Sequence, residues 1–249
     1  MRFFNLLIVG LVGSLLLWGT MDFPRWADPN APASRHVSPY YLEHAIDDME
    51  VPNVVSAILA DYRGYDTMYE TVVIFCAGIS ILLLLRVGET AYMKKRSLKI
   101  RLVRRNPILI IACRILFPAI VLFALYVIAH GHHSPGGGFQ GGVILGAGFI
   151  LIALAYNMHI AIVIFYPRLH RFIAALGVTI YSLVGLICLL LGGNFLDYSA
   201  LSKILPVSPA EARSLGILAV EIGVGFTVMA IMFSIYADLS TRGRLRRGL

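Results

Sequence analysis

Residues with the chemistry to move protons or ions gather in three places along the chain. The first is the stretch His130-Gly-His-His-Ser-Pro-Gly-Gly-Gly-Phe-Gln-Gly-Gly142. Imidazole titrates near neutral pH, so His130 and His132 could carry protons. A zinc site is disfavoured because adjacent histidines point apart, and a phosphate loop because no Lys-Ser/Thr pair follows. The favoured interpretation is a turn between helices with histidines near a wet path, and both proton transfer and a purely structural role remain open.

Glycine is concentrated in and after this stretch. Eight of the 23 glycines fall between Gly131 and Gly148, where they permit positive φ and close backbone approach. Lipid offers no partners for exposed backbone, so the segment is expected to be buried in protein or to line a wet cavity. The small residues that follow allow another helix to pack closely. The residues assigned to this structural motif are Pro135, Gly136, Gly137, Gly138, Phe139, Gln140, Gly141 and Gly142.

The second cluster is Asp61-Tyr-Arg-Gly-Tyr-Asp66-Thr-Met-Tyr-Glu70, at the start of an apolar run. Asp66 can cap the helix that begins after it, and Glu70 falls about one turn later on the same side. Arg63 could pair with either carboxylate. Two interpretations are open: a capped helix end with surface ion pairs, and an entry point for a proton or cation, which Glu70 facing the apolar run favours.

Charged residues inside apolar runs form the third set. Arg114 and Glu221 each lie two turns into such a run. Intramembrane charge costs about 2.5–3.5 kcal/mol on insertion scales and normally faces the protein interior. Arg114 could snorkel to the headgroups, whereas Glu221 belongs either to an ion path or to a neutral or paired structural carboxyl. The two residues are expected near opposite leaflets and therefore not as a simple pair.

A membrane-spanning fold must position these residues. The chain has 249 residues, of which 58% are hydrophobic and 14% charged, against about 45–50% and about 25% in a soluble domain. This excludes a soluble domain, a disordered chain and a disulfide scaffold. Six apolar segments are near the roughly 20 residues that cross a bilayer, which predicts an all-α polytopic protein with six transmembrane helices. The segments are Phe3–Trp18, Glu70–Leu85, Ile108–Ala129, Gly142–Tyr156 (or onward to Phe165), Phe172–Leu191 and Leu215–Ala237.

The positions of lysine and arginine predict the orientation. With the N-terminus inside, 15 of them lie on the cytoplasmic side and 5 outside, so both termini are expected to be cytoplasmic. The net charge of +7 is then an orientation signal, and nucleic-acid binding loses its support. The first outer loop is long and acidic. It is expected to hold a short helix over Pro39–Met49, behind Ser38 as the cap, and an apolar segment, Val51–Tyr62, too short to span, that lies in the interface or dips back into the complex.

At these residues the chain resembles a known family. Gly131–Gly142, followed by an apolar helix, resembles the signature of the MnhB family in Mrp-type multisubunit sodium/proton antiporters, and the likeness covers about residues 107–240. Asn53–Glu70 resembles the C-terminal end of the large subunit of the same antiporters, where the pattern Asp-x-Arg-Gly-aromatic-Asp-Thr-x-x-Glu opens a helix. Typical MnhB chains lack an N-terminal helix pair, so this chain looks like a fusion of a part over 1–106 and a part over 107–249, with a seam at Arg86–Arg105.

The resemblance implies an accessory membrane subunit of a sodium/proton antiporter, without a catalytic site, cofactor or metal of its own. Its expected partners are the other subunits of a hetero-oligomeric membrane complex, among them a large antiporter-like subunit, together with the bilayer of the cell membrane, sodium ions and protons. The ion-path candidates are Asp61, Arg63, Asp66, Glu70, Arg114, His130, His132 and Glu221. Two alternatives stay open: an ion-translocating subunit of a hydrogenase or sulfur-reducing complex, and a purely structural scaffold.

Overall fold

The computed structural model describes residues 2–90 and 106–241, and the side chains of 3–85 and 106–241. Within those ranges every regular element is a helix, and six helices are long and apolar enough to cross a membrane. The prediction of an all-α protein with six candidate spans is confirmed. Most of the basic segment Arg86–Arg105, and the basic tail after Thr241, lie outside the described residues. The six helices are α1 (Arg2–Gly19), α4 (Gly64–Thr90), α5 (Pro107–Ala129), α6 (Gly138–Ala155), α8 (Pro167–Leu190) and α9 (Pro209–Thr241).

The chain divides into two compact units, Met1–His44 and Ala45–Leu249. The first unit contains α1, whose side chains are exposed along nearly its whole length, a 3₁₀ turn η1 (Thr20–Asp22) and a π-helical turn η2 (Ala33–Val37). Helix α2 (Ser38–Met49) continues directly from η2, so Ser38 is the first residue of the helix and not a separate cap. The predicted boundary between 106 and 107 stays a prediction.

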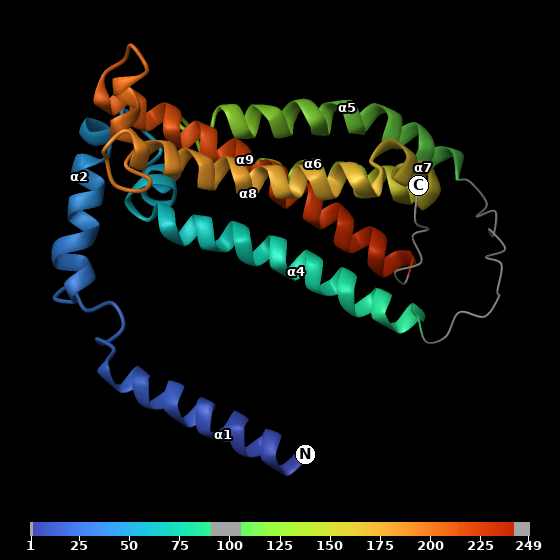
Figure 1. Cartoon of the computed structure of the whole chain (residues 1–249), viewed down its shortest axis with the longest axis horizontal. Coiled ribbons are helices and arrows are strands. Elements are labelled where there is room, and N and C mark those ends of the chain that lie inside the picture. The colour runs from blue at the N-terminus through green and yellow to red at the C-terminus, as the bar shows by residue number, and fades with distance from the viewer. Residues whose placement is uncertain (1, 91–105, 242–249) are drawn as a thin grey trace. The chain divides into compact units, whose positions relative to one another are not determined.

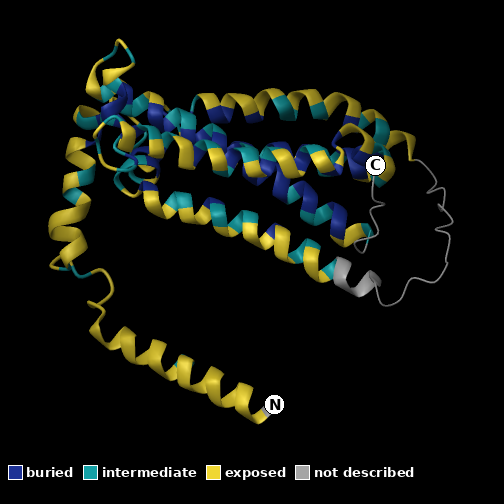
Figure 2. Ribbon diagram, in the orientation of Figure 1, coloured by how far each residue is buried: buried dark blue, intermediate teal, exposed yellow. Residues whose placement is uncertain are grey.

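In the second unit α9 is the central helix. It packs against α8 and α6, and more lightly against α4, while α5 packs against α6. Of the most apolar window of α9, 61% is buried, against 11% for α4 and for α5. Figure 2 shows the buried residues concentrated on α9, while α5 is largely exposed. Most side chains in the middle of α9 are therefore enclosed by protein, among them that of Glu221.

Glycine pairs bring the central helices into backbone contact. A Cβ atom added at Gly142 of α6 would lie 2.7 Å from the carbonyl oxygen of Gly225 on α9. A Cβ added at Gly177 of α8 would lie 2.2 Å from the carbonyl oxygen of Gly223. Real side chains do not come this close, so α9 can pack on both neighbours only because these positions have no side chain.

Local signals define the helix ends. Asn106 caps α5 by accepting from the Ile108 N–H, and Ser208 caps α9 by accepting from the Glu211 N–H at 3.0 Å. Asn157 has a φ of 137°, which separates α6 from the short helix α7 (Met158–Ile164). The alternative in which the fourth span continues to Phe165 is therefore wrong.

Three connecting segments gather at one end of the second unit, and α7 lies at the other end (Figure 1). These segments are 50–63, 130–137 and 191–208. The predicted short apolar segment forms α3 (Val54–Ala57) and the π-helical turn η3 (Ile58–Tyr62). It is held to the bundle by Tyr198, whose hydroxyl donates to the Ala60 carbonyl at 3.0 Å. Which end faces the cytoplasm stays a prediction.

Candidate functional site

A cavity of about 250 Å³ lies where the short apolar segment formed by α3 and η3 meets the bundle. Residues of α3, η3, α4, α6 and α9 form its wall, together with Gly136 from the loop before α6. Most of the wall is apolar, and the polar side chains concentrate on few positions. They are Ser56, Thr67, Glu70, Thr71, Gln140 and Glu221. The structure thus brings the two predicted carboxylates Glu70 and Glu221 to one cavity, although 151 positions separate them in the chain.

Glu221 is the deepest charged group of the cavity. It lies on the fourth turn of α9 and is 8% exposed. Its Oε2 atom has no hydrogen-bond partner among the described residues, and the Nε2 atom of His132 lies 3.9 Å from it. A buried carboxyl oxygen without a hydrogen-bond partner is expensive to keep as a structural element.

The glycine-rich loop closes around this carboxyl with backbone atoms. A Cβ added at Gly137 would lie 2.9 Å from Glu221 Oε1, and one at Gly131 would lie 3.2 Å from Oε2. A Cβ at Gly138 would lie 1.8 Å from the Glu221 carbonyl oxygen. Gly137 also has a φ of +130°, which L side chains rarely adopt. The loop therefore needs glycine at these positions because it packs directly on one turn of α9.

Asn53 ties the same loop to the short apolar segment. Its backbone N–H donates to the His132 carbonyl at 2.9 Å. Its side-chain amide donates to the carbonyls of Gly131 at 2.7 Å and Ser134 at 2.8 Å, and the Ser56 hydroxyl also donates to Gly131 at 2.9 Å. The backbone that lipid could not satisfy is thus satisfied within the protein. Sequence reasoning missed Asn53 and Ser56, and the only local signal was an asparagine at a helix N-cap.

The charged residues around the start of α4 belong to two separate ion pairs. Asp61 accepts two hydrogen bonds from Arg213 of α9, at 2.8 and 2.6 Å. Arg63 pairs with Asp66, its Nε donating at 2.6 Å. Helix α4 begins at Gly64, so Asp66 lies in its first turn and the expectation that Asp66 caps a later helix start is wrong. Arg213 was not singled out in the sequence.

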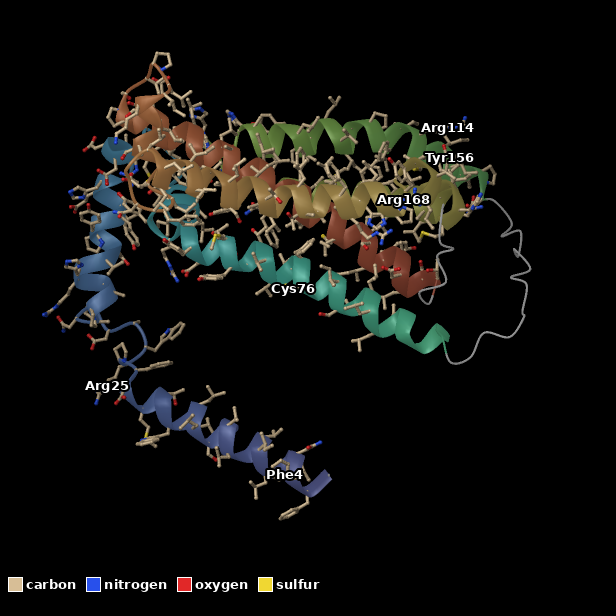
Figure 3. The ribbon with its side chains drawn as sticks, viewed as in Figure 1. Phe4, Arg25, Cys76, Arg114, Tyr156 and Arg168 are labelled. Atoms are coloured by element: carbon tan, nitrogen blue, oxygen red, sulfur yellow. The ribbon has the colours of Figure 1, made fainter. Side chains whose placement is uncertain are left out.

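The remaining candidates lie away from the cavity. Arg114 on α5 is exposed, and its Nε donates to the Tyr156 hydroxyl at 3.1 Å. Figure 3 shows these two side chains close together at the end of the bundle that holds α7. His130 is half-buried and lies against the Tyr126 ring, with ring centroids 5.0 Å apart. Neither Arg114 nor His130 lines the cavity.

Burial changes the acidity of two groups at this end of the bundle. Burial, and secondly the neighbouring His133, lower the pKa of His132, so its imidazole is mostly neutral at pH 7. Burial raises the pKa of Tyr198, so its hydroxyl stays protonated and keeps donating to Ala60. Among the described residues no group of three or more histidine, cysteine or acidic side chains is placed to hold a metal ion.

Two family profiles match the chain, one over its N-terminal part and one over its C-terminal part. Residues 108–234 match a domain related to the MnhB subunit of Na+/H+ antiporter. Residues 14–94 match the MbhE profile, which describes one of the subunits of MBH. A putative antiporter subunit mnhB2 of Staphylococcus aureus is 31% identical over 121 residues, which are 49% of this chain and 84% of that protein. An uncharacterized protein of Methanocaldococcus jannaschii is 30% identical over 210 residues, with 78% of each chain covered.

Two solved membrane complexes contain chains of similar structure. One is the membrane-bound sulfane sulfur reductase, an archaeal respiratory membrane complex, with a TM-score of 0.64 and 26% identity over 96% of this chain and 97% of that chain. The other is the Mrp complex from Dietzia sp. DQ12-45-1b, with a TM-score of 0.56 and 28% identity. This match covers 92% of our chain but only 25% of the longer chain in the Mrp complex.

Proposed function

Because the chain belongs to the family of domains related to the MnhB subunit of Na+/H+ antiporters, we propose that it is an accessory membrane subunit of a monovalent cation/proton antiporter. The chain is a multi-pass membrane protein, a subunit of an Mrp-type antiporter or of a related membrane complex. Within that class, we place it in the cell membrane, in contact with a large antiporter-like subunit, in a complex that exchanges sodium ions for protons.

One observation carries the proposed role. The buried Glu221 carboxyl opens on a cavity that Glu70 also lines, and Glu221 Oε2 has no hydrogen-bond partner among the described residues. A carboxyl held only for structure would be paired or replaced by an apolar residue. Ionisable groups inside membrane proteins face water-filled cavities when they serve ion paths. We therefore assign Glu70 and Glu221 to the border of a path shared with neighbouring subunits, with Asp66 at its mouth.

The two family matches support the choice of partner. We propose that residues 1–106 correspond to the C-terminal end of a large antiporter subunit and 107–249 to the MnhB subunit, joined in one chain. The profile matches over 14–94 and 108–234 fall within these two parts, and this chain aligns with a quarter of a longer Mrp-complex chain. A chain of this kind would pack directly against the antiporter-like subunit that it completes.

The test replaces the two carboxylates in the assembled complex. Glu70→Gln and Glu221→Gln keep side-chain size and remove the charge. Sodium/proton exchange in membrane vesicles, measured per assembled complex, is expected to fall. Glu211→Gln is the matched control, because Glu211 lies on α9 as well but is exposed and does not line the cavity. Unchanged exchange in both variants at normal complex abundance would instead support a scaffold without an ion path.

A redox-linked complex is the second candidate, and one observation favours it. A chain of the sulfane sulfur reductase complex aligns over 97% of its length with 96% of this chain, so the two share nearly all their architecture. The partners distinguish the candidates. Purification of the whole complex in mild detergent with iron–sulfur subunits would favour the respiratory complex. Purification with antiporter-like subunits alone would favour the antiporter.

A further inference from the structure

His132 contacts Glu221 from outside the cavity. Its Nε2 atom lies 3.9 Å from Glu221 Oε2, and its Nδ1 atom lies 3.4 Å from the Ser214 hydroxyl, two turns closer to the loop end of α9. His132 is not among the residues that line the cavity, whereas Glu221 is. Ser214, His132 and Glu221 are therefore neighbours in succession, from the loop end of the bundle to the carboxyl in the cavity wall.

Neither of the two atoms that face each other is satisfied. His132 Nε2 and Glu221 Oε2 are both buried and have no hydrogen-bond partner among the described residues. A separation of 3.9 Å is too long for a direct hydrogen bond, so a proton passes between the two atoms only when a side-chain movement brings them closer. A pair kept this close, yet not bonded, is suited to exchange a proton and not to lock a structure.

The glycines around the carboxyl place backbone, and no side chain, next to its two oxygens. Cβ atoms at Gly131 and Gly137 would lie 3.2 Å from Oε2 and 2.9 Å from Oε1. No side chain therefore presses on either oxygen from these two positions of the loop. Movement of the carboxyl toward the imidazole would therefore meet no side chain at these two positions.

We propose that His132 is the proton-transfer partner of Glu221 and connects it to the loop end of the bundle. When a side-chain movement brings the two atoms within hydrogen-bond distance, the imidazolium gives the proton on Nε2 to Oε2 of the Glu221 carboxylate. The products are a neutral imidazole and a carboxylic acid. The reverse step returns the proton. This inference rests on the proposed ion path at Glu221 and adds a route by which protons reach it without crossing the cavity.

The surrounding charges fit this role. Burial lowers the pKa of His132, and the neighbouring His133 lowers it further, so the imidazole of His132 is mostly neutral at pH 7. Glu221 and Ser214 face His132 from α9, and His133 and His130 belong to its own loop. Glu221 in turn is faced by His132, and it shares the cavity with Glu70 of α4 and Ser56 of α3.

The experiment compares His132→Gln with His133→Gln in the assembled complex. Sodium/proton exchange per complex is measured in vesicles across the range in which imidazole titrates, roughly pH 5 to 8. In the unaltered chain the rate falls as pH rises through the pKa of His132, because fewer imidazolium groups are available. His132→Gln is expected to slow exchange by about tenfold or more at the acid end and to remove this pH step. His133→Gln is expected to keep the step, moved to slightly higher pH.

The outcomes separate this inference from the proposed function. An unchanged rate in His132→Gln would overturn the inference, and so would a rate lowered equally at every pH with the step retained, which indicates a structural role. If His132→Gln lowers complex abundance, His132→Asn is measured against the same two criteria. Normal exchange in Glu221→Gln would overturn the ion path itself. Loss of exchange in Glu221→Gln, with a normal profile in His132→Gln, would overturn only the histidine route.

Discussion

At the scale of single residues, the site is a carboxyl enclosed by backbone. Gly131, Gly137 and Gly138 approach Glu221 so closely that a Cβ at any of them would lie between 1.8 and 3.2 Å from one of its atoms. An arginine or lysine at this place would pair with the carboxyl and hold it. Glycine encloses Glu221 without placing a charged side chain against it, which the proposed role in an ion path requires.

Gly138→Ala tests this packing. The added Cβ would lie 1.8 Å from the Glu221 carbonyl oxygen, which is backbone and cannot move aside. We expect the free energy of unfolding to fall by about 3 kcal/mol or more, at or above the usual range for overpacking. Thermal unfolding in detergent measures it. Gly64→Ala is the control, because its nearest contact would be an ordinary 3.5 Å. Equal stability of the two variants would contradict the packing.

Part of the site could be predicted residue by residue. Glu221 and Glu70 stand out because charge is rare within or beside apolar runs, and the glycine motif because of its density. Arg213 and Asn53 could not be found in the same way, since their partners lie 152 and 78 residues away in the chain. Nothing near either residue in the sequence shows that it has a distant partner.

At the scale of elements, the segment from α3 to the start of α4 covers the cavity and joins three parts of the bundle. Asn53 holds the loop before α6, and Asp61 holds α9. Tyr181 of α8 donates to the Gly64 carbonyl at 2.8 Å. A segment too short to span and rich in exposed backbone is stable at this depth because these partners satisfy it.

Asp61→Asn tests the strongest of these links. The Asp61 side chain is 8% exposed and that of Arg213 is 22% exposed, and breaking an enclosed pair leaves a charge without its partner. We expect the free energy of unfolding to fall by about 2 kcal/mol or more. The control Asp66→Asn breaks the neighbouring pair with Arg63, whose side chains are 48% and 59% exposed, and should cost less than about 1 kcal/mol. Denaturation in detergent compares them, and a larger loss in Asp66→Asn would refute this link.

Element positions were easier to predict than element ends. All six long helices coincide with the apolar segments, because sustained hydropathy leaves few alternatives. The ends differ where a backbone angle or a distant contact decides. Asn157 terminates α6 with a positive φ, and Gly64 begins α4 two residues before Asp66. Neither helix end changes the hydropathy of its apolar segment, so the hydropathy pattern could not predict where these helices end or begin.

At the scale of the whole molecule, the loops before α4, before α6 and before α9 share one end of the second unit (Figure 1). Successive long helices of this unit run in opposite directions (Figure 1), so every second connection lies at the same end. The distribution of lysine and arginine predicts that this end faces outward. The cavity lined by Glu70 and Glu221 would then lie near the outer side of the membrane.

Cysteine labelling tests that orientation. Figure 3 shows Cys76 on α4, and it is exposed, whereas Cys113 and Cys188 are buried, so Cys76→Ser gives a quiet background. In that background, Asn194→Cys and His159→Cys place exposed thiols at the two ends. We expect a membrane-impermeant maleimide to label Asn194→Cys in intact cells. His159→Cys should be labelled only after permeabilisation, because loops rich in lysine and arginine stay on the cytoplasmic side. The reverse labelling pattern would show that the predicted orientation is wrong.

The central claim is that Glu221 borders an ion path, and exchange by the whole complex measures it most directly. Sodium/proton exchange in vesicles is compared for the unaltered complex, Glu221→Gln, Glu221→Asp and Glu211→Gln at equal complex abundance. We predict a loss of about tenfold or more in Glu221→Gln, partial activity in Glu221→Asp, which keeps the charge, and no loss in Glu211→Gln. Full exchange in Glu221→Gln would contradict the account.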